Sequence, residues 1–121
     1  MITDGVEVFG GVSRDPHFGL TIAFGMGGVG VEVLRDFALL PIPLREGDAE
    51  AMIEETRGAA LLGAFRGRSA VDKAALAQCL YALSDFAAAN SDRIEEIDLN
   101  PIKARAQGCV IVDALIVPRR T

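Results

Sequence analysis

The pattern of hydrophobic and polar positions divides the chain into strand-like stretches near each end and helical stretches between them. Apolar runs that alternate or are nearly continuous predict strands over residues 6–13, 20–24 and 37–43. A turn over 14–19 joins the first two strands, because Asp-Pro and a following Gly interrupt regular structure. The pair of glycines at 10–11 is compatible with a bulge in the first strand.

Apolar residues at helical spacing predict two helices in the middle of the chain. The first spans 49–56, with Asp48 as its N-cap, Met52 and Ile53 facing inward, and Gly58 ending it.

The second helix is the longest element that the pattern predicts. It begins at a capping box formed by Ser69 and Asp72 and runs to about Ala89. One apolar stripe faces the core, and it consists of Leu76, Leu80, Leu83 and Ala87. We interpret this stripe as core and not as a binding groove.

Two apolar stretches, 95–102 and 108–113, are separated by a short polar break and predict an antiparallel hairpin. Gly108 can supply a positive φ at the turn. If Arg105 faces Gly108, then Asn100 faces Asp113 with Cβ atoms about 5 Å apart. Alternate residues of a strand share a face, so Asp98 points the same way as Asn100. A register slip of one residue would turn Asp113 to the opposite face.

Asp98, Asn100 and Asp113 would then place two carboxylates and an amide oxygen on one patch. Oxygen ligands of this kind suit a hard cation such as Mg²⁺, which takes its remaining ligands from water and from substrate phosphates. The alternative is an amphipathic hairpin whose polar face is simply solvated. We favour the metal site, because three oxygen donors converge on a strongly apolar hairpin.

Two glycine-rich segments are further candidates for anion contacts. Gly25, Gly27 and Gly30 match the spacing of a dinucleotide-binding fingerprint, but no helix follows and no βαβ repeat is visible. A glycine loop whose N–H groups approach an anion and an ordinary tight turn remain equally good interpretations. Arg66 and Arg68 lie between glycines and are candidates for phosphate or carboxylate contacts, with a solvated loop as the alternative.

Composition narrows the class of protein. The 121 residues are 50% hydrophobic and 24% charged with a net charge of −5, which predicts one globular domain and argues against nucleic-acid binding through a basic surface. No apolar stretch approaches a membrane span and no leader pattern is visible, so we expect a cytoplasmic protein.

Cys79 and Cys109 belong to no CxxC or CxxH pair, and buried thiols are expected over a disulfide or zinc site. His17 should be a surface residue at a turn.

Four motifs in order resemble the NDP-forming acyl-CoA synthetases, the enzymes of the ADP-forming acetyl-CoA synthetase and succinyl-CoA synthetase type. They occupy residues 7–19, 24–32, 61–67 and 96–101, so the resemblance covers nearly the whole chain. It corresponds to the C-terminal part of the family's ATP-grasp domain. The implied fold is α+β, with a mixed or mostly antiparallel sheet and helices packed on one face. The chain, 1–121, would be a single domain cut from a longer synthetase.

The resemblance also implies roles for the polar residues of the hairpin and of the arginine loop. Asn100 and Asp113 match the positions that hold the Mg²⁺–nucleotide complex, and Asp98 matches an acidic partner beside them. Arg66 matches the arginine of the family's Arg-Gly element. Asp98 and Arg66 are therefore the expected catalytic residues.

Three further residues match positions near the nucleotide. Glu7 matches a carboxylate close to the ribose, and Gly27 and Gly28 match the glycine loop beside the transferring phosphate. The family joins a carboxylic acid to coenzyme A at the expense of ATP or GTP, through an acyl phosphate and a phosphohistidine. Positioning and charge neutralisation dominate such phosphoryl transfers, which agrees with a metal, an arginine and backbone N–H groups.

The chain lacks the family's lysine-bearing lid and its CoA-binding and ligase regions, which would be its partners, and His17 does not match the phosphorylated histidine. The chain alone should therefore be inactive. It should self-associate through the face on which the lid would pack. A different class remains open: a non-catalytic module that senses a nucleotide or acyl-CoA, as in the synthetase-like part of protein acetyltransferases.

Overall fold

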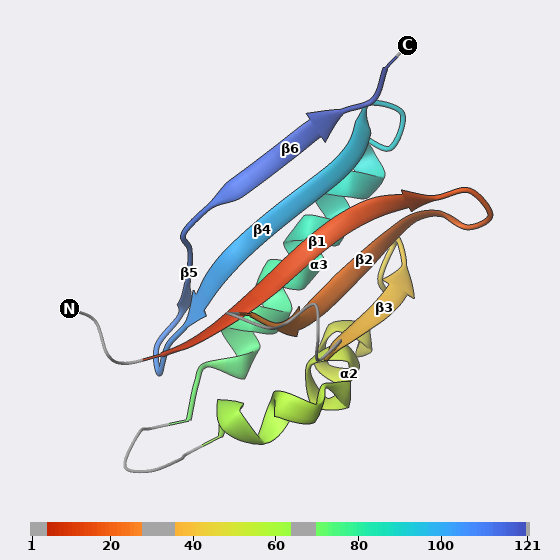
Figure 1. The fold of residues 1–121 in the computed structure, drawn as a ribbon. Helices are drawn as coiled ribbons and strands as arrows, with labels where there is room; N and C mark the ends of the chain where they lie inside the picture. The colour runs from red at the N-terminus through yellow and green to blue at the C-terminus, as the bar shows by residue number, and fades with distance from the viewer. Residues whose placement is uncertain (1–4, 28–35, 64–69, 121) are drawn as a thin grey trace.

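A computed structural model describes residues 5–27, 36–63 and 70–120 of the chain (Figure 1). In this part, six strands form one sheet in which every ladder is antiparallel. The strands are β1 (Val6–Asp15), β2 (Gly19–Met26), β3 (Phe37–Pro41), β4 (Ile94–Ala104), β5 (Cys109–Ile111) and β6 (Ala114–Pro118). Their order is β3-β2-β1-β4-β5, and β6 continues along β4 beyond β5.

The helices of the described residues lie on one face of the sheet, and none of them covers the other face (Figure 1). They are α2 (Asp48–Glu55), the 3-10 helix η1 (Arg57–Leu62) and α3 (Lys73–Ala89). The expected α+β architecture, with helices packed on one face, is confirmed, and the sheet is purely antiparallel in the described residues. None of the helices in these ranges is long and apolar enough to cross a membrane.

The core lies between the sheet and α3. The stripe predicted on this helix is buried throughout, as are alternate residues of the two central hairpin strands. The largest fully buried side chains of the sheet are Val8, Val12, Ile22, Phe24 and Ile102. Met52 and Ile53 of α2 face inward, as predicted, and are no more than 1% exposed. Burial of this apolar surface is the main stabilising contribution to the fold.

The start of α2 differs from the prediction. Gly47, in the left-handed region at φ 90°, is the N-cap, and Asp48 is the first helical residue. The carboxylate of Asp48 instead accepts the N–H of Arg45 at 2.8 Å, so it closes the preceding turn. The C-cap of the helix is Thr56, two residues before Gly58.

The start of α3 also differs from the prediction, because Asp72 is itself the N-cap. Its carboxylate accepts the N–H of Ala75 at 3.0 Å, and the helix begins at Lys73. Ser69, the expected cap, lies outside the described residues. The other carboxylate oxygen of Asp72 accepts the N–H of Gly108 at 2.9 Å, and the N–H of Asp72 donates to the carbonyl oxygen of Arg105 at 2.6 Å. Asp72 therefore joins the start of α3 to the turn between β4 and β5.

Stability should depend on pH through Asp72. The N–H donors of Gly108 and then Ala75 lower the pKa of this carboxyl. Its stabilising effect is therefore present above the unfolded-state pKa of about 3.9 and is lost as pH falls through the lower folded-state pKa. We expect Asp72→Ala to lower Tm at pH 7, and the difference from wild type to shrink below pH 4. Asp85→Ala, an exposed acid on the same helix, is the control. An equal difference at pH 3 and pH 7 would contradict this account.

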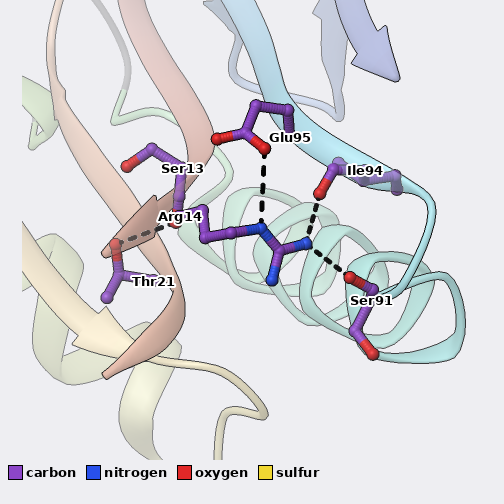
Figure 2. A network of polar contacts seen from close by, with 6 residues as sticks. All are labelled: Ser13, Arg14, Thr21, Ser91, Ile94 and Glu95. Atoms are coloured by element: carbon purple, nitrogen blue, oxygen red, sulfur yellow. Dashed lines mark hydrogen bonds and ion pairs between the residues drawn. The ribbon is translucent and has the colours of Figure 1, made fainter. Parts of the chain in front are cut away.

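The loop between α3 and β4 is tied to the sheet by Arg14, the penultimate residue of β1 (Figure 2). One terminal nitrogen of its guanidinium donates to the carbonyl oxygens of Ser91 and Ile94, each at 2.5 Å. Its Nε lies 3.7 Å from a carboxylate oxygen of Glu95. Figure 2 shows the guanidinium reaching from the strand into this loop, so Arg14 helps to place the beginning of β4.

Candidate functional site

The register of the C-terminal hairpin places Asn100 opposite Asp113. The turn closes with an Arg105 N–H to Gly108 carbonyl hydrogen bond of 3.1 Å, and Gly108 has φ 75°. Further along, the N–H of Asn100 donates to the carbonyl oxygen of Asp113 at 3.1 Å. This is the register that the sequence predicts. Both residues are exposed, so their side chains are accessible to a ligand.

Asp98 lies on the open face of the sheet, on the same side as Asn100. Its neighbours Ile97 and Leu99 are buried under α3, at 3% and 7% exposure, whereas Asp98 is half-buried. In the sheet it faces Gly11 of β1 on one side and Leu115 of β6 on the other. Because Gly11 has no side chain, no β1 side chain lies beside Asp98 at this position of the described sheet.

Pro101 coincides with an irregularity in β4. The pairing with β1 shifts between Val8–Ile102 and Gly10–Leu99, so β4 carries an extra residue at this point. The missing N–H of Pro101 fits such a place, since no ladder hydrogen bond is required there. The irregularity expected near the glycines at 10–11 therefore lies in β4, and β1 pairs continuously with β2 through both glycines.

The chemistry of these side chains fits a hard cation. Within the described residues, Asp98, Asn100 and Asp113 form no side-chain hydrogen bond or ion pair with another protein group. No cluster of three or more acidic, histidine or cysteine side chains suited to a metal occurs in that part of the chain. The candidate set is thus two acids and one amide, which leaves most of a coordination sphere for water and phosphate oxygens.

Glu7 and Gly27 lie next to each other at the start of β1. The N–H of Gly27 donates to the carbonyl oxygen of Glu7 at 2.9 Å, and a Cβ at Gly27 would lie 3.2 Å from the backbone of Glu7 and Val8. On the other side, Glu7 faces Lys103 of β4. Lys103 is three residues along β4 from Asn100, or about 10 Å. The pair Glu7 and Gly27 therefore lies in the same half of the open sheet face as Asn100.

Gly28 and Arg66, the remaining predicted site residues, lie outside the described residues.

Asp36 is a structural residue that the sequence did not reveal. Its carboxylate oxygens accept the N–H groups of Arg57 at 2.6 Å and Gly58 at 2.8 Å, and its carbonyl accepts the N–H of Met26 at 3.1 Å. It thereby links the end of β2 to the start of η1. A single aspartate 21 residues before its partner has no local pattern that would identify it.

Comparison with known proteins identifies the family to which this fold belongs. Residues 1–117 match the model of the ATP-grasp domain. The chain is 40% identical to the acetate–CoA ligase [ADP-forming] II subunit beta of Pyrococcus furiosus, over 97% of this chain and 50% of that protein. It is 34% identical to the 4-hydroxybutyrate–CoA ligase [ADP-forming] of Nitrosopumilus maritimus, over 96% of this chain and 17% of that protein. The chain thus spans about half the length of its subunit-type relatives.

Comparison with solved structures identifies the same family. The dinucleotide-forming acetyl-coenzyme A synthetase 1 of Ca. Korarchaeum cryptofilum superposes with a TM-score of 0.91 at 43% identity, over 98% of this chain and 55% of that one. That structure is a complex with coenzyme A and Mg-AMPPCP. The fold, the family model and relatives of this similarity agree, and the chain therefore belongs to the ATP-grasp domain family, in the form found in ADP-forming acyl-CoA synthetases.

Proposed function

We propose that this chain is the Mg²⁺- and nucleotide-binding part of an ADP-forming acyl-CoA synthetase. The complete enzyme would make acyl-CoA from a carboxylic acid, coenzyme A and ATP. One observation carries the proposal: the hairpin register pairs Asn100 with Asp113, both of which are exposed, and half-buried Asp98 lies two residues from Asn100 on β4. The similarity to acetate–CoA ligases supports the reaction class.

Asn100 and Asp113 would hold Mg²⁺, and Asp98 would add negative charge beside it. The three side chains are accessible and form no protein contacts that a cation would have to displace within the described residues. Bound Mg²⁺ neutralises phosphate charge and helps to orient the phosphoryl group. The protein groups hold this charge in place on a rigid sheet, so little reorganisation is needed when the substrate binds.

Glu7 and Gly27 would contact the nucleotide on the side away from the proposed Mg²⁺ ligands, within the same half of the sheet face. A side chain at position 27 would crowd the backbone of Glu7, so glycine keeps this approach open. Gly28 and Arg66 are proposed to complete the phosphate contacts, from the resemblance alone.

His17 is a poor candidate for a phosphorylated histidine in this arrangement. It lies in the turn after β1, while Glu7 and Gly27 lie at the beginning of that strand. Eight residues of extended chain separate Glu7 from Asp15, which corresponds to about 26 Å. The histidine that carries a phosphoryl group would therefore come from outside this chain. The chain alone should not form acyl-CoA.

The complete enzyme would also cover apolar surface that this chain leaves open. Large side chains of β5 and β6 remain 45–57% exposed, among them Val110, Ile111, Leu115 and Ile116. Exposure on this scale is expected of a part that packs against further protein.

Replacing Asn100 by alanine tests the metal site directly. We expect Asn100→Ala to weaken Mg²⁺-dependent ADP binding about tenfold or more, because one oxygen ligand is lost. The measurement is calorimetric titration of the purified protein in its native assembly, with Mg²⁺ and with EDTA. The difference between variant and wild type should disappear in EDTA.

Gln107→Ala is the matched control, because Gln107 is an exposed amide at the turn of the same hairpin. Its affinity should equal that of wild type under both conditions. Unchanged Mg²⁺-dependent binding in Asn100→Ala would refute the proposed metal site. Nucleotide binding that depends on Asn100, in a complete protein without synthetase activity, would favour a sensing module over an enzyme.

A further inference from the structure

The two cysteines of the chain come together in the fold although they are far apart in sequence. Cys79 lies on α3, and Cys109 is the first residue of β5. The Cys109 Sγ is 3.9 Å from the carbonyl oxygen of Ala75, which precedes Cys79 by one helical turn. The side chain of Cys109 therefore lies beside the turn of α3 that carries Cys79, close enough for each thiol to affect the pKa of the other.

The elements that carry the two thiols are fastened to each other. Asp72, at the start of α3, accepts the N–H of Gly108, the residue before Cys109, at 2.9 Å. Its own N–H donates to the carbonyl oxygen of Arg105 across the same turn at 2.6 Å. Both cysteines pack against the core, and both are free thiols. These two hydrogen bonds hold α3 and the start of β5, which carry the two thiols, against each other.

A surface groove gives access to Cys79. An open groove of about 410 Å³ runs along the side of α3 and includes Cys79 in its lining. The rest of the lining is apolar, with Phe86, Ile111 and Ile116 among its residues. Both cysteine residues are half-buried, so each residue keeps part of its surface exposed.

We propose that Cys79 and Cys109 form a modification site, a dithiol that a low-molecular-weight disulfide oxidises to an intramolecular disulfide between α3 and β5. The thiolate of Cys109 attacks one sulfur of the small disulfide and releases one small thiolate. The thiolate of Cys79 then attacks the Sγ of Cys109 and releases the second. Two protein thiols are oxidised, and one small disulfide is reduced to two thiols that take up the two protons.

The order of the two attacks follows from the surroundings of the thiols. Burial, and then the charge of Cys109, raise the pKa of Cys79 to about 11. Burial also raises the pKa of Cys109, the neighbouring Cys79 thiol lowers it, and the charge of Asp72 adds a smaller increase. Cys109 therefore forms a thiolate more readily and attacks first. Closure should be slow at pH 7 and should accelerate as pH rises toward 10.

The disulfide would fix the helix to the hairpin that carries Asn100 and Asp113. It would close a loop of about 30 residues, which restricts the unfolded chain and raises Tm by on the order of 10 °C. This site is independent of the proposed catalytic function, because neither sulfur belongs to the candidate metal set.

Oxidised glutathione is the probe for the test. The purified protein is incubated with it at pH 7 and pH 9, quenched with acid, and analysed by intact mass and by non-reducing tryptic mapping. We expect the chain to lose two thiols and about 2 Da. The peptides spanning 74–93 and 106–119 should become linked, faster at pH 9, and Tm should rise.

Single variants distinguish this closure from simple surface modification. Cys79→Ala should stop at a stable glutathione adduct on Cys109, and Cys109→Ala should react slowly because the remaining thiol has the higher pKa. Two free thiols after prolonged exposure at pH 9 would overturn the proposal. Stable glutathione adducts on both cysteines of the wild-type chain, or linkage only between two chains, would overturn it equally.

Discussion

Replacing Asp113 by asparagine is expected to lower the rate of acyl-CoA formation by about 100-fold or more in the complete enzyme. The side chain keeps its shape and its place opposite Asn100, but it loses the charge that would hold Mg²⁺. Removing one preorganised electrostatic contact typically costs two to three orders of magnitude in turnover. The measurement is steady-state synthesis of acyl-CoA at several Mg²⁺ concentrations, where excess Mg²⁺ should restore part of the rate.

Asp92→Asn is the matched control for that experiment. Asp92 is an exposed acid in the loop between α3 and β4, and the change of side chain is the same. Its rate should equal that of wild type at every Mg²⁺ concentration. A rate in Asp113→Asn within threefold of wild type would remove the catalytic role proposed for the hairpin, and a loss that Mg²⁺ does not alter would point to a structural effect.

Truncation of Phe24 to alanine should have the largest effect on stability. Phe24 is a residue of β2, and its side chain is fully buried in the core at 0% exposure. Loss of a buried phenylalanine costs about 3–5 kcal/mol, through lost transfer energy and the cavity that remains. Domains of this size are stable by only about 5–15 kcal/mol. The variant should therefore unfold at a much lower urea concentration than wild type.

Phe18→Ala supplies the comparison on the same pair of strands. Phe18 lies in the turn between β1 and β2 and is 75% exposed, so its loss should change the free energy of unfolding by no more than about 0.5 kcal/mol. Urea denaturation followed by circular dichroism measures both variants. Similar midpoints for Phe24→Ala and Phe18→Ala would mean that the core does not lie where the structure places it.

Local patterns are enough to predict much of the fold. The stripe of α3 follows from helical spacing alone, and all four predicted residues are buried. The hairpin register follows from a turn at Gly108 and simple counting along two strands, and the backbone hydrogen bonds confirm it. The sequence is therefore sufficient to pair Asn100 with Asp113, because short-range geometry decides their positions.

Contacts between distant segments cannot be predicted in the same way. Asp72 caps a helix and also holds a turn 36 residues away, and Arg14 reaches a loop 77 residues away. Neither contact leaves a periodic signal, because it depends on how the finished layers pack. The predicted start of α3 at Ser69 is wrong for this reason. Asp72 is the N-cap, and it is held in place by a hydrogen bond from the distant Gly108. The nearness of Cys79 to Cys109 leaves no sequence signal either.

The residues of the candidate site also differ in how far the sequence predicts them. The hairpin residues follow from strand geometry, whereas Glu7 and Gly27 are identified through resemblance, and the structure places them side by side. Their roles remain predictions, as do those of Gly28 and Arg66.

The hairpin limits where this chain can change length over evolution. Asn100 and Asp113 are paired by counting outward from Gly108, so one residue inserted within 101–104 or 109–112 would carry one member of the pair to the helix side. The tip at 106–107 lies beyond the paired rungs and can lengthen without disturbing them. Among homologues, insertions and deletions should therefore gather at that tip and be absent from the flanking strands.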